Sequence, residues 1–165
     1  MTAIGTRLDH ARDVAGAVVD PEIPVITIAD LGVLRGVDLR ADGTVEVAIT
    51  PTYSGCPALD TIAADVESAL HEAGFERVLV RTVLAPAWST DQITSAGRDA
   101  LAGYGIAPPG PVRSPTDPVL LTLSVRCPQC GSPDTEQTSF FAATACKALW
   151  RCRSCREPFE LFKTL

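Results

Sequence analysis

Hydrophobic residues recur along much of the chain with the periods of helices and strands. Between residues 8 and 19 they stand three or four apart, which predicts a helix that ends at Asp20-Pro21, because the residue before a proline avoids helical angles. A second helix is predicted from Pro57, and Gly74 is expected to close it. The two apolar stripes are Leu8, Ala11, Ala15, Val18 and Val19, and Leu59, Ile62, Val66, Leu70 and Ala73.

Three stretches rich in β-branched residues predict strands at residues 33–39, 45–49 and 78–84. The Asp-Gly pair between the first two favours a hairpin, so these strands should pair antiparallel. The third follows the second across a helix and should run parallel to it, although the pattern leaves its place in the sheet open. A further helix is predicted from Ser89, whose spacing to Gln92 is that of a capping box.

A proline-rich segment divides the chain, since five of the eleven residues from 108 to 118 are proline. We therefore expect an α+β domain over residues 1–107, with a small three-stranded sheet and helices in two layers. A linker over 108–118 and a small module over 119–165 would follow. The strands predicted in this module, at 119–125, 135–140 and 159–163, are too few to bury a core without a metal.

The strongest motif lies in the C-terminal module. Cys127-Pro128-Gln129-Cys130 and Cys152-Arg153-Ser154-Cys155 are two C-x-x-C pairs separated by 21 residues, which is typical of four-cysteine zinc ribbons. Four thiolates complete a tetrahedron and leave no open position for a substrate, so a structural zinc site is favoured over a catalytic one. Iron held by the same ligands is the alternative.

Cys56 stands where the strand over 45–49 meets the second helix. Free backbone N–H groups and the positive end of the helix dipole favour a thiolate there, whereas the carboxylate of Asp60 acts against it. Cys56 is therefore a candidate metal-binding or reactive sulfur, with a gap-filling buried cysteine as the alternative. Thr52, Tyr53 and Ser54 place three hydroxyls beside it.

Other candidate residues depend on the fold. Asp20 and Glu22 are either solvated loop charges or, if the fold brings them beside Cys56, members of the same site. Cys146 lies outside both cysteine pairs, and simple packing and a functional thiol beside Lys147 are both open.

Composition and charge narrow the classes of function. Residues 1–118 contain eight arginines and sixteen acids, a net charge of −8, which excludes nucleic-acid binding by this part. Residues 119–165 carry six bases and four acids, and with a bound tetrathiolate metal they are about neutral, which favours a protein surface. Two histidines cannot build a His-rich metalloenzyme site. With neither a signal peptide nor an apolar run long enough for a membrane span, we expect a cytoplasmic protein.

Seven short segments, taken together, resemble a known family. Three are Asp20-Pro21-Glu22-Ile23-Pro24, Asp30-Leu31-Gly32 and Thr50-Pro51-Thr52-Tyr53-Ser54-Gly55-Cys56-Pro57. Four more are Pro86-Ala87-Trp88-Ser89-Thr90-Asp91, Tyr104-Gly105-Ile106-Ala107-Pro108-Pro109, Cys146-Lys147-Ala148 and Glu157-Pro158-Phe159. The first three resemble the MIP18 (DUF59) family of iron–sulfur assembly proteins. With the others, the chain resembles the PaaD family, the D components of phenylacetyl-CoA epoxidase systems, from about Leu8 to Lys163.

The chain departs from this family at two places. The family pattern has Phe-Gly-Ser-Thr before the cysteine that matches Cys146, whereas this chain has Phe141-Ala142-Ala143-Thr144. Gln92 stands where a second aromatic residue is expected. The first departure puts a special backbone turn near Cys146 in doubt, and the second weakens any role of the loop around Trp88.

The resemblance implies an accessory role in aerobic phenylacetate catabolism. In that pathway a di-iron oxygenase epoxidises the ring of phenylacetyl-CoA with electrons from a flavin and iron–sulfur reductase. The chain would help to install the reductase cluster or the oxygenase iron, with these components and the iron–sulfur assembly machinery as partners. Cys56 becomes the candidate iron or cluster ligand, and Asp20, Glu22 and Thr52 its neighbours.

A single cysteine cannot hold a cluster alone, since clusters normally take four ligands. Shared ligation is therefore expected, with a partner's thiolate or a second copy in a homodimer. The alternative is a non-catalytic subunit that binds and stabilises the oxygenase. Thiol-redox chemistry between Cys56 and Cys146 is less favoured, because they lie in separate modules. We expect no catalysis by this chain alone, since His71 lies about 22 Å along the helix from Cys56.

Overall fold

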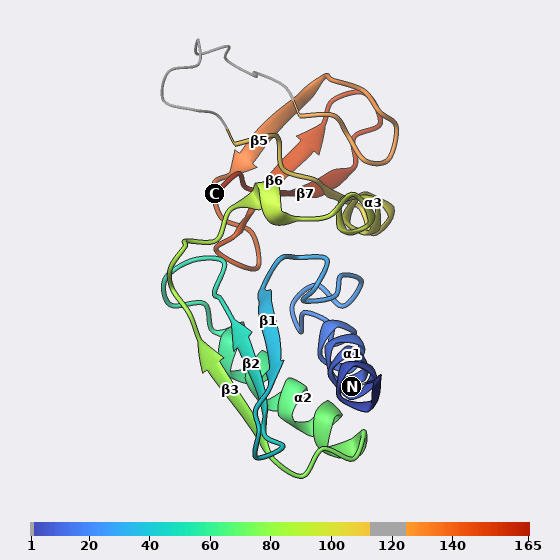
Figure 1. The fold of residues 1–165 in the computed structure, drawn as a ribbon. Helices are drawn as coiled ribbons and strands as arrows, with labels where there is room; N and C mark the ends of the chain where they lie inside the picture. The colour runs from blue at the N-terminus through green and yellow to red at the C-terminus, as the bar shows by residue number, and fades with distance from the viewer. Residues whose placement is uncertain (1, 113–124) are drawn as a thin grey trace. The chain divides into compact units, whose positions relative to one another are not determined.

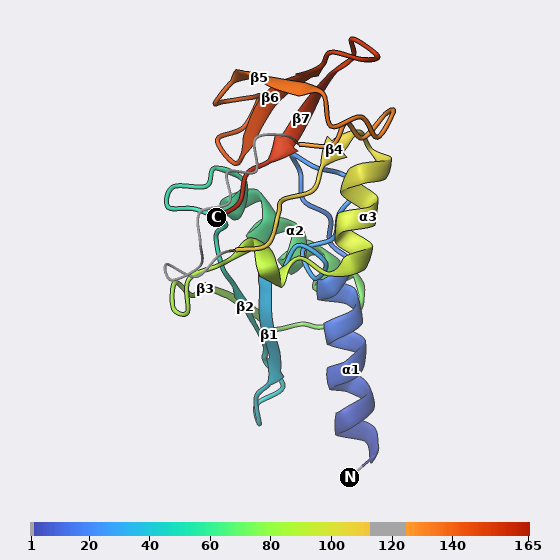
Figure 2. The ribbon, with the colours of Figure 1, turned by 90° about the horizontal axis from the view of Figure 1, so that it is seen from above.

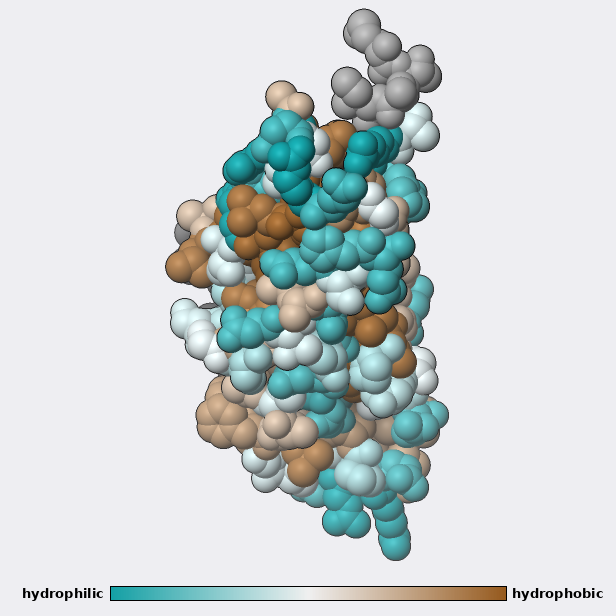
Figure 3. Space-filling view, turned by 90° about the horizontal axis from the view of Figure 1, so that it is seen from below, coloured by the Kyte–Doolittle hydropathy of each residue, from teal (hydrophilic) through white to brown (hydrophobic). Residues whose placement is uncertain are grey.

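The Asp-Gly turn and its flanking strands form a hairpin in the computed structural model, which describes residues 2–112 and 125–165. Contacts divide the described chain into two compact units. The first contains the residues up to 88 together with 92–94, and the second contains 89–91 and the residues from 95 onward. On the face drawn in Figure 3, hydrophobic residues occupy several separate areas among hydrophilic ones.

The first unit is a three-stranded sheet with two helices on one face (Figures 1 and 2). The sheet has the order β1-β2-β3, in which β1 and β2 are antiparallel and β2 and β3 are parallel neighbours. The expected α+β fold is therefore confirmed, and the place of the third strand, which the sequence left open, is beside β2. The elements are α1 (Thr2–Gly16), β1 (Leu34–Leu39), β2 (Val45–Ile49), α2 (Ala58–Glu72) and β3 (Val78–Thr82).

The core of this unit lies between the sheet and the helices, with a large share from the loop that follows α1. The helix ends at Gly16, earlier than expected, because the chain turns back: Val19 bridges Thr27, and the N–H of Ile28 donates to the carbonyl of Val18 at 2.8 Å. The buried residues include Val45, Val47 and Ile49 of β2, Ile62, Val66 and Leu70 of α2, and Ile23, Ile26, Ile28, Leu31 and Val33 of the loop.

The second unit is a four-stranded sheet of order β4-β7-β6-β5 with α3 beside β4. Strands β5, β6 and β7 are antiparallel, and β4 runs parallel to β7. The predicted strand over 119–125 lies, apart from Val125, outside the described residues. Strands β4 and β6 were not expected. The elements are α3 (Ser95–Gly103), β4 (Ile106–Ala107), β5 (Thr135–Ser139), β6 (Lys147–Cys152) and β7 (Pro158–Phe162).

The middle of the chain differs from the sequence predictions at the start of α3 and in the unit to which α3 and β4 belong. The helix predicted from Ser89 is wrong in its start: residues 90–92 form a single 3₁₀ turn and α3 begins at Ser95, because the N–H of Thr94 donates to the carbonyl of Asp30 at 2.9 Å. Helix α3 and strand β4, placed in the first domain by the sequence, group with the ribbon strands. The domain boundary near residue 107 stays a prediction.

Within the described residues, the helices lack the combination of length and apolar character that spanning a membrane requires.

Candidate functional site

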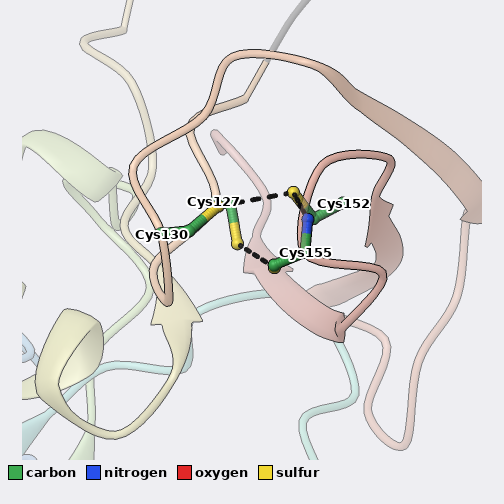
Figure 4. A group of neighbouring side chains, drawn as sticks. All are labelled: Cys127, Cys130, Cys152 and Cys155. Atoms are coloured by element: carbon green, nitrogen blue, oxygen red, sulfur yellow. Dashed lines mark hydrogen bonds between the residues drawn. The ribbon is translucent and has the colours of Figure 1, made fainter.

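The two C-x-x-C segments form tight turns that bring four sulfurs to one point (Figure 4). In the first turn the N–H of Gly131 donates to the carbonyl of Cys127 at 2.8 Å, and Gly131 has φ +73°, a left-handed conformation that glycine adopts without steric cost. In the second turn the N–H of Cys155 donates to the sulfur of Cys152 at 3.4 Å. The sequence prediction that these pairs converge is confirmed.

The spacing of the sulfurs fits a tetrahedral metal site. Sulfurs bound to zinc at about 2.3 Å in a tetrahedron lie about 3.8 Å from one another. Here Cys127 Sγ is 3.7 Å from Cys155 Sγ, Cys130 Sγ is 3.6 Å from Cys152 Sγ, and all four lie within 4.8 Å of one another. The four cysteines are therefore placed to hold one metal ion with tetrahedral geometry.

The four-cysteine cluster is also part of the hydrophobic core of the second unit. Cys127 and Cys152 are buried with Ala107 and Phe159, whereas Cys130 and Cys155 are exposed. The backbone N–H of Cys155 and the neighbouring thiols lower the pKa of the Cys152 thiol to about 6, whereas burial and the neighbouring thiols raise the pKa of the Cys155 thiol to about 12. The cluster therefore loses its first proton most easily at Cys152. A bound ion would join the two turns and the small core, which is how a closed structural site acts.

Residues 50–57, which we call the Cys56 loop, connect β2 to α2. Cys56 lies at the start of α2, as the sequence predicts, and is partly exposed. The loop turns through Gly55, which has φ +84°, and the N–H of Cys56 donates to the carbonyl of Tyr53 at 3.3 Å. Pro57 is the N-cap residue of the helix, and none of the described side chains caps it. The N–H of Ala58 and the hydroxyl of Thr52 both donate to the Cys56 sulfur.

The expectation that Cys56 is held as a thiolate is wrong for the protein without metal. Burial raises the pKa of the Cys56 thiol above its ordinary value, and the negative charges of Glu22 and Asp20 add to this increase. The hydrogen bonds from Ala58 and Thr52 act in the opposite direction but do not outweigh burial. Cys56 is therefore a neutral thiol at neutral pH, and a bound cation would have to displace its proton.

The fold brings the two predicted carboxylates close enough to Cys56 for their charges to act on it. Asp20 is buried, and its Oδ1 accepts hydrogen bonds from the N–H groups of Glu22 at 2.8 Å and Ile23 at 2.9 Å. Asp20 therefore shapes the loop that presents Glu22, which is half-buried. The reading of these residues as independent solvated charges does not fit, while their role toward a ligand stays a prediction.

A hollow of about 170 Å³ lies beside the Cys56 loop. Trp88 forms one wall, and its indole N–H donates to the carbonyl of Leu31 at 3.0 Å. Trp88 is buried and packs at the edge of this hollow, while a role in covering a functional site stays a prediction. Leu84 was missed as a lining residue, since only the turn after β3 brings it here. The lining residues are Thr50, Pro51, Thr52, Tyr53, Ser54, Leu84, Ala87 and Trp88.

Cys146 lies in the second unit, apart from the four-cysteine cluster. It is buried, and its sulfur is 3.1 Å from the hydroxyl of Thr144. The ammonium group of the adjacent Lys147 lies 2.6 Å from Glu160 Oε2, so it is engaged in an ion pair. This environment is that of a packed residue, and a functional role for Cys146 stays a prediction.

Comparisons with known proteins match two separate stretches of the chain to two different families of domain. Residues 10–80 match a family model described as an iron–sulfur cluster assembly protein, and residues 113–163 match one described as the PaaD zinc beta ribbon domain. An Escherichia coli K12 protein, named provisionally as the D component of 1,2-phenylacetyl-CoA epoxidase, is 47% identical over 88% of this chain and 86% of its own length.

Two further comparisons each cover about half of the chain. An Fe-S protein maturation auxiliary factor of Porphyromonas gingivalis W83 is 40% identical over 47% of this chain and 73% of its own length. A crystal structure of a domain of unknown function, DUF59, from Bacillus anthracis has a TM-score of 0.55 at 25% identity, and covers 60% of this chain and 94% of its own. On the similarity to the E. coli protein and on both family models, the chain belongs to the PaaD family.

Proposed function

We propose that this chain is an accessory factor of a phenylacetyl-CoA epoxidase system that transiently holds iron or an iron–sulfur cluster through Cys56. Its clients would be the reductase, which needs a cluster, or the oxygenase, which needs a di-iron site. The cargo would be shared with a thiolate of a partner, of the assembly machinery or of a second copy, because one cysteine cannot complete a cluster.

One observation carries this proposal. Cys56 is partly exposed at a helix start, within reach of the Thr52 hydroxyl and of the charges of Glu22 and Asp20. Thiolate and carboxylate together suit iron, and the acids that raise the pKa of the free thiol would stabilise a bound cation. The names of the relatives support the same role, since one is a maturation factor for iron–sulfur proteins and another an epoxidase component.

The four-cysteine cluster has a different role in this proposal. We assign it a structural zinc ion, held by Cys127, Cys130, Cys152 and Cys155, because the closed tetrahedron leaves no position for a cargo ligand. Four thiolates also accept iron, so the metal content of the purified protein decides between the two ions.

The test replaces Cys56 with alanine in cells that produce the epoxidase components and lack the natural copy of this chain. The reductase and the oxygenase are then purified, and their iron and cluster contents are measured. We expect both contents to fall to the level of cells without the chain, and Thr61→Ala, an exposed change on α2 outside the hollow, to leave them normal. Normal contents with Cys56→Ala would defeat the proposal.

The raised pKa of Cys56 favours a second candidate function. A neutral thiol is a poor metal ligand, and a subunit that only binds and stabilises the oxygenase would not need it ionised. In that case Cys56→Ala would be silent, whereas removal of residues 119–165 would abolish copurification with the oxygenase components.

A further inference from the structure

An open apolar pocket lies on one face of the sheet in the second unit. Its volume is about 370 Å³, and it holds none of the residues that bind metal or stand near Cys56. Gln137 pairs with Trp150 and Ala148 with Leu161 in the strand register, so side chains of β5, β6 and β7 form its floor together. We call it the ribbon pocket; it is lined by Gln137, Phe140, Ala148, Trp150, Leu161, Lys163, Thr164 and Leu165.

Two exposed aromatic rings stand at the ribbon pocket. Phe140 and Phe141 are each 62% exposed, and their rings meet edge to face with centroids 5.2 Å apart. Large adjacent aromatic side chains are costly to leave in water and are enriched at the centres of protein interfaces. Because Phe140 also lines the pocket, the pair extends the apolar surface beyond it.

Lys163 provides a positive charge at the same place. Its ammonium nitrogen lies 4.3 Å from the centroid of the Phe140 ring and 4.6 Å from that of Phe141, and it donates to the carbonyl of Phe140 at 3.3 Å. The ion pairs formed within the described residues do not include Lys163, and Glu160, three residues before it in the sequence, pairs with Lys147. The two rings therefore hold a cation that is in none of the ion pairs among the described residues.

Trp150 adds a polar group that lacks a partner. Its indole N–H is buried, and the described part of the chain offers it no hydrogen-bond acceptor. Buried donors are nearly always paired in native proteins, so an orphan beside a pocket indicates a missing acceptor. Among the residues that the structure describes, the pocket thus combines an apolar floor with an unpaired donor and a cation that forms no ion pair.

We propose that the ribbon pocket is the docking site for a partner protein that inserts an apolar side chain flanked by a carboxylate. The apolar side chain would cover Phe140, Phe141 and Leu161, and the carboxylate would pair with Lys163. This inference rests on the proposed function in one respect, which is that the partner belongs to the epoxidase system. It assigns docking to the second unit and leaves cargo binding to Cys56 in the first.

The experiment measures copurification of the oxygenase and reductase components with tagged, full-length chain, and then the affinity of the purified pair. We expect Phe140→Ser combined with Phe141→Ser to weaken binding roughly tenfold or more, as loss of central aromatic contacts does. Lys163→Glu should weaken binding similarly, and Lys163→Arg should preserve it, because only the charge is required. Zinc content and thermal unfolding of each variant show whether the ribbon remains folded.

Matched controls separate this site from others. Tyr104→Ser removes another exposed aromatic ring of the second unit, and Arg151→Glu reverses an exposed charge on β6 outside the pocket; both should bind normally. Cys56→Ala should also bind normally while the iron content of the clients falls, which distinguishes this proposal from the cargo role. Unchanged binding of the double Phe variant, or a wild-type chain that binds neither component, would overturn it. So would variants that only change the oligomeric state of the chain itself.

Discussion

At the scale of single residues, a few positions shape the loops that carry the candidate ligands. Gly32 has φ +78°, and a Cβ at this position would lie 2.8 Å from the Cβ of Gln92 and 3.0 Å from its carbonyl oxygen. Thr94 Oγ1 donates to Asp30 Oδ1 at 2.6 Å in the same place. The Asp30-Leu31-Gly32 segment therefore anchors residues 92–94 and, through the carbonyl of Leu31, the indole of Trp88.

Two glycine substitutions separate backbone strain from this close packing. Gly43 has φ +84°, and none of the described heavy atoms lies within 4 Å of an added Cβ, so Gly43→Ala should lower the free energy of unfolding by about 1 kcal/mol. Gly32→Ala adds the clash with Gln92 and should lower it by about 3 kcal/mol. Urea unfolding measures both, and equal losses would contradict the anchoring contact.

The raised pKa of Cys56 gives a pH dependence with a defined sign. At pH 7 its alkylation by iodoacetamide should be slower than that of a free cysteine, and the rate should still rise past pH 9, the ordinary pKa. Glu22→Gln removes a negative charge and should speed the reaction, whereas Thr52→Val removes a donor and should slow it. Site-resolved mass spectrometry gives the rates. If the alkylation rate instead reached a plateau below pH 8, the helix N-terminus would lower the pKa of the Cys56 thiol by more than burial raises it.

At the scale of secondary-structure elements, each unit has a small sheet that supports one candidate site. In the first unit, β2 and α2 flank the loop that carries Cys56. The buried side chains of Ile62, Val66 and Leu70 pack α2 into the core and so fix the position of its N-terminus. In the second, two of the four cysteines are themselves core residues. The first unit has a larger hydrocarbon core, whereas we expect the ribbon strands to need a bound metal for stability.

Metal removal should therefore act on the ribbon strands before it acts on the first sheet. We expect about one zinc ion per chain in the purified protein, and none with Cys130→Ser, because three thiolates lose the closed tetrahedron. In both the chelated protein and this variant, β5–β7 should lose protection from hydrogen exchange while β1–β3 keep it. Mass spectrometry of exchanged peptides measures this, and equal loss in both sheets would disprove the separate dependence.

At the scale of the whole molecule, the chain separates a cysteine that is a candidate for cargo from a surface that is a candidate for docking. Cys56 belongs to the first unit, which is strongly acidic, with thirteen acids and six arginines for a net charge of −7. The ribbon pocket belongs to the second unit. Because the two sets of residues do not overlap, a substitution in one set tests its role without removing a residue of the other.

Fragments of the chain test where the first unit ends. Residues 92–94 pack on the Asp30-Leu31-Gly32 segment, so a fragment of residues 1–94 should unfold at higher urea concentration than one of residues 1–88. Extending the fragment to residue 107 should raise the urea midpoint little, because β4 pairs with β7 of the second unit and α3 contacts β4. Urea unfolding followed by circular dichroism gives the midpoints. A large gain between residues 94 and 107 would restore the boundary that the sequence predicts.

The sequence by itself determined the features that depend on neighbours along the chain. The β1–β2 hairpin follows from an Asp-Gly turn, α2 from an apolar stripe closed by Gly74, and the four-cysteine cluster from two C-x-x-C turns. In each case the conformation is fixed within a few residues, by turn geometry, by helical period or by the chemistry of four thiols. The family was recognised from motifs of the same local kind.

Only the tertiary structure decided what depends on burial and on distant partners. The charge state of Cys56 is set by how deeply the fold buries its sulfur and by the approach of Glu22 and Asp20, and local helix-dipole reasoning gave the opposite sign. The ribbon pocket, the orphaned indole of Trp150 and strand β6 likewise exist only once strands distant in sequence pair. Desolvation and register are properties of the assembled fold, so no local pattern encodes them.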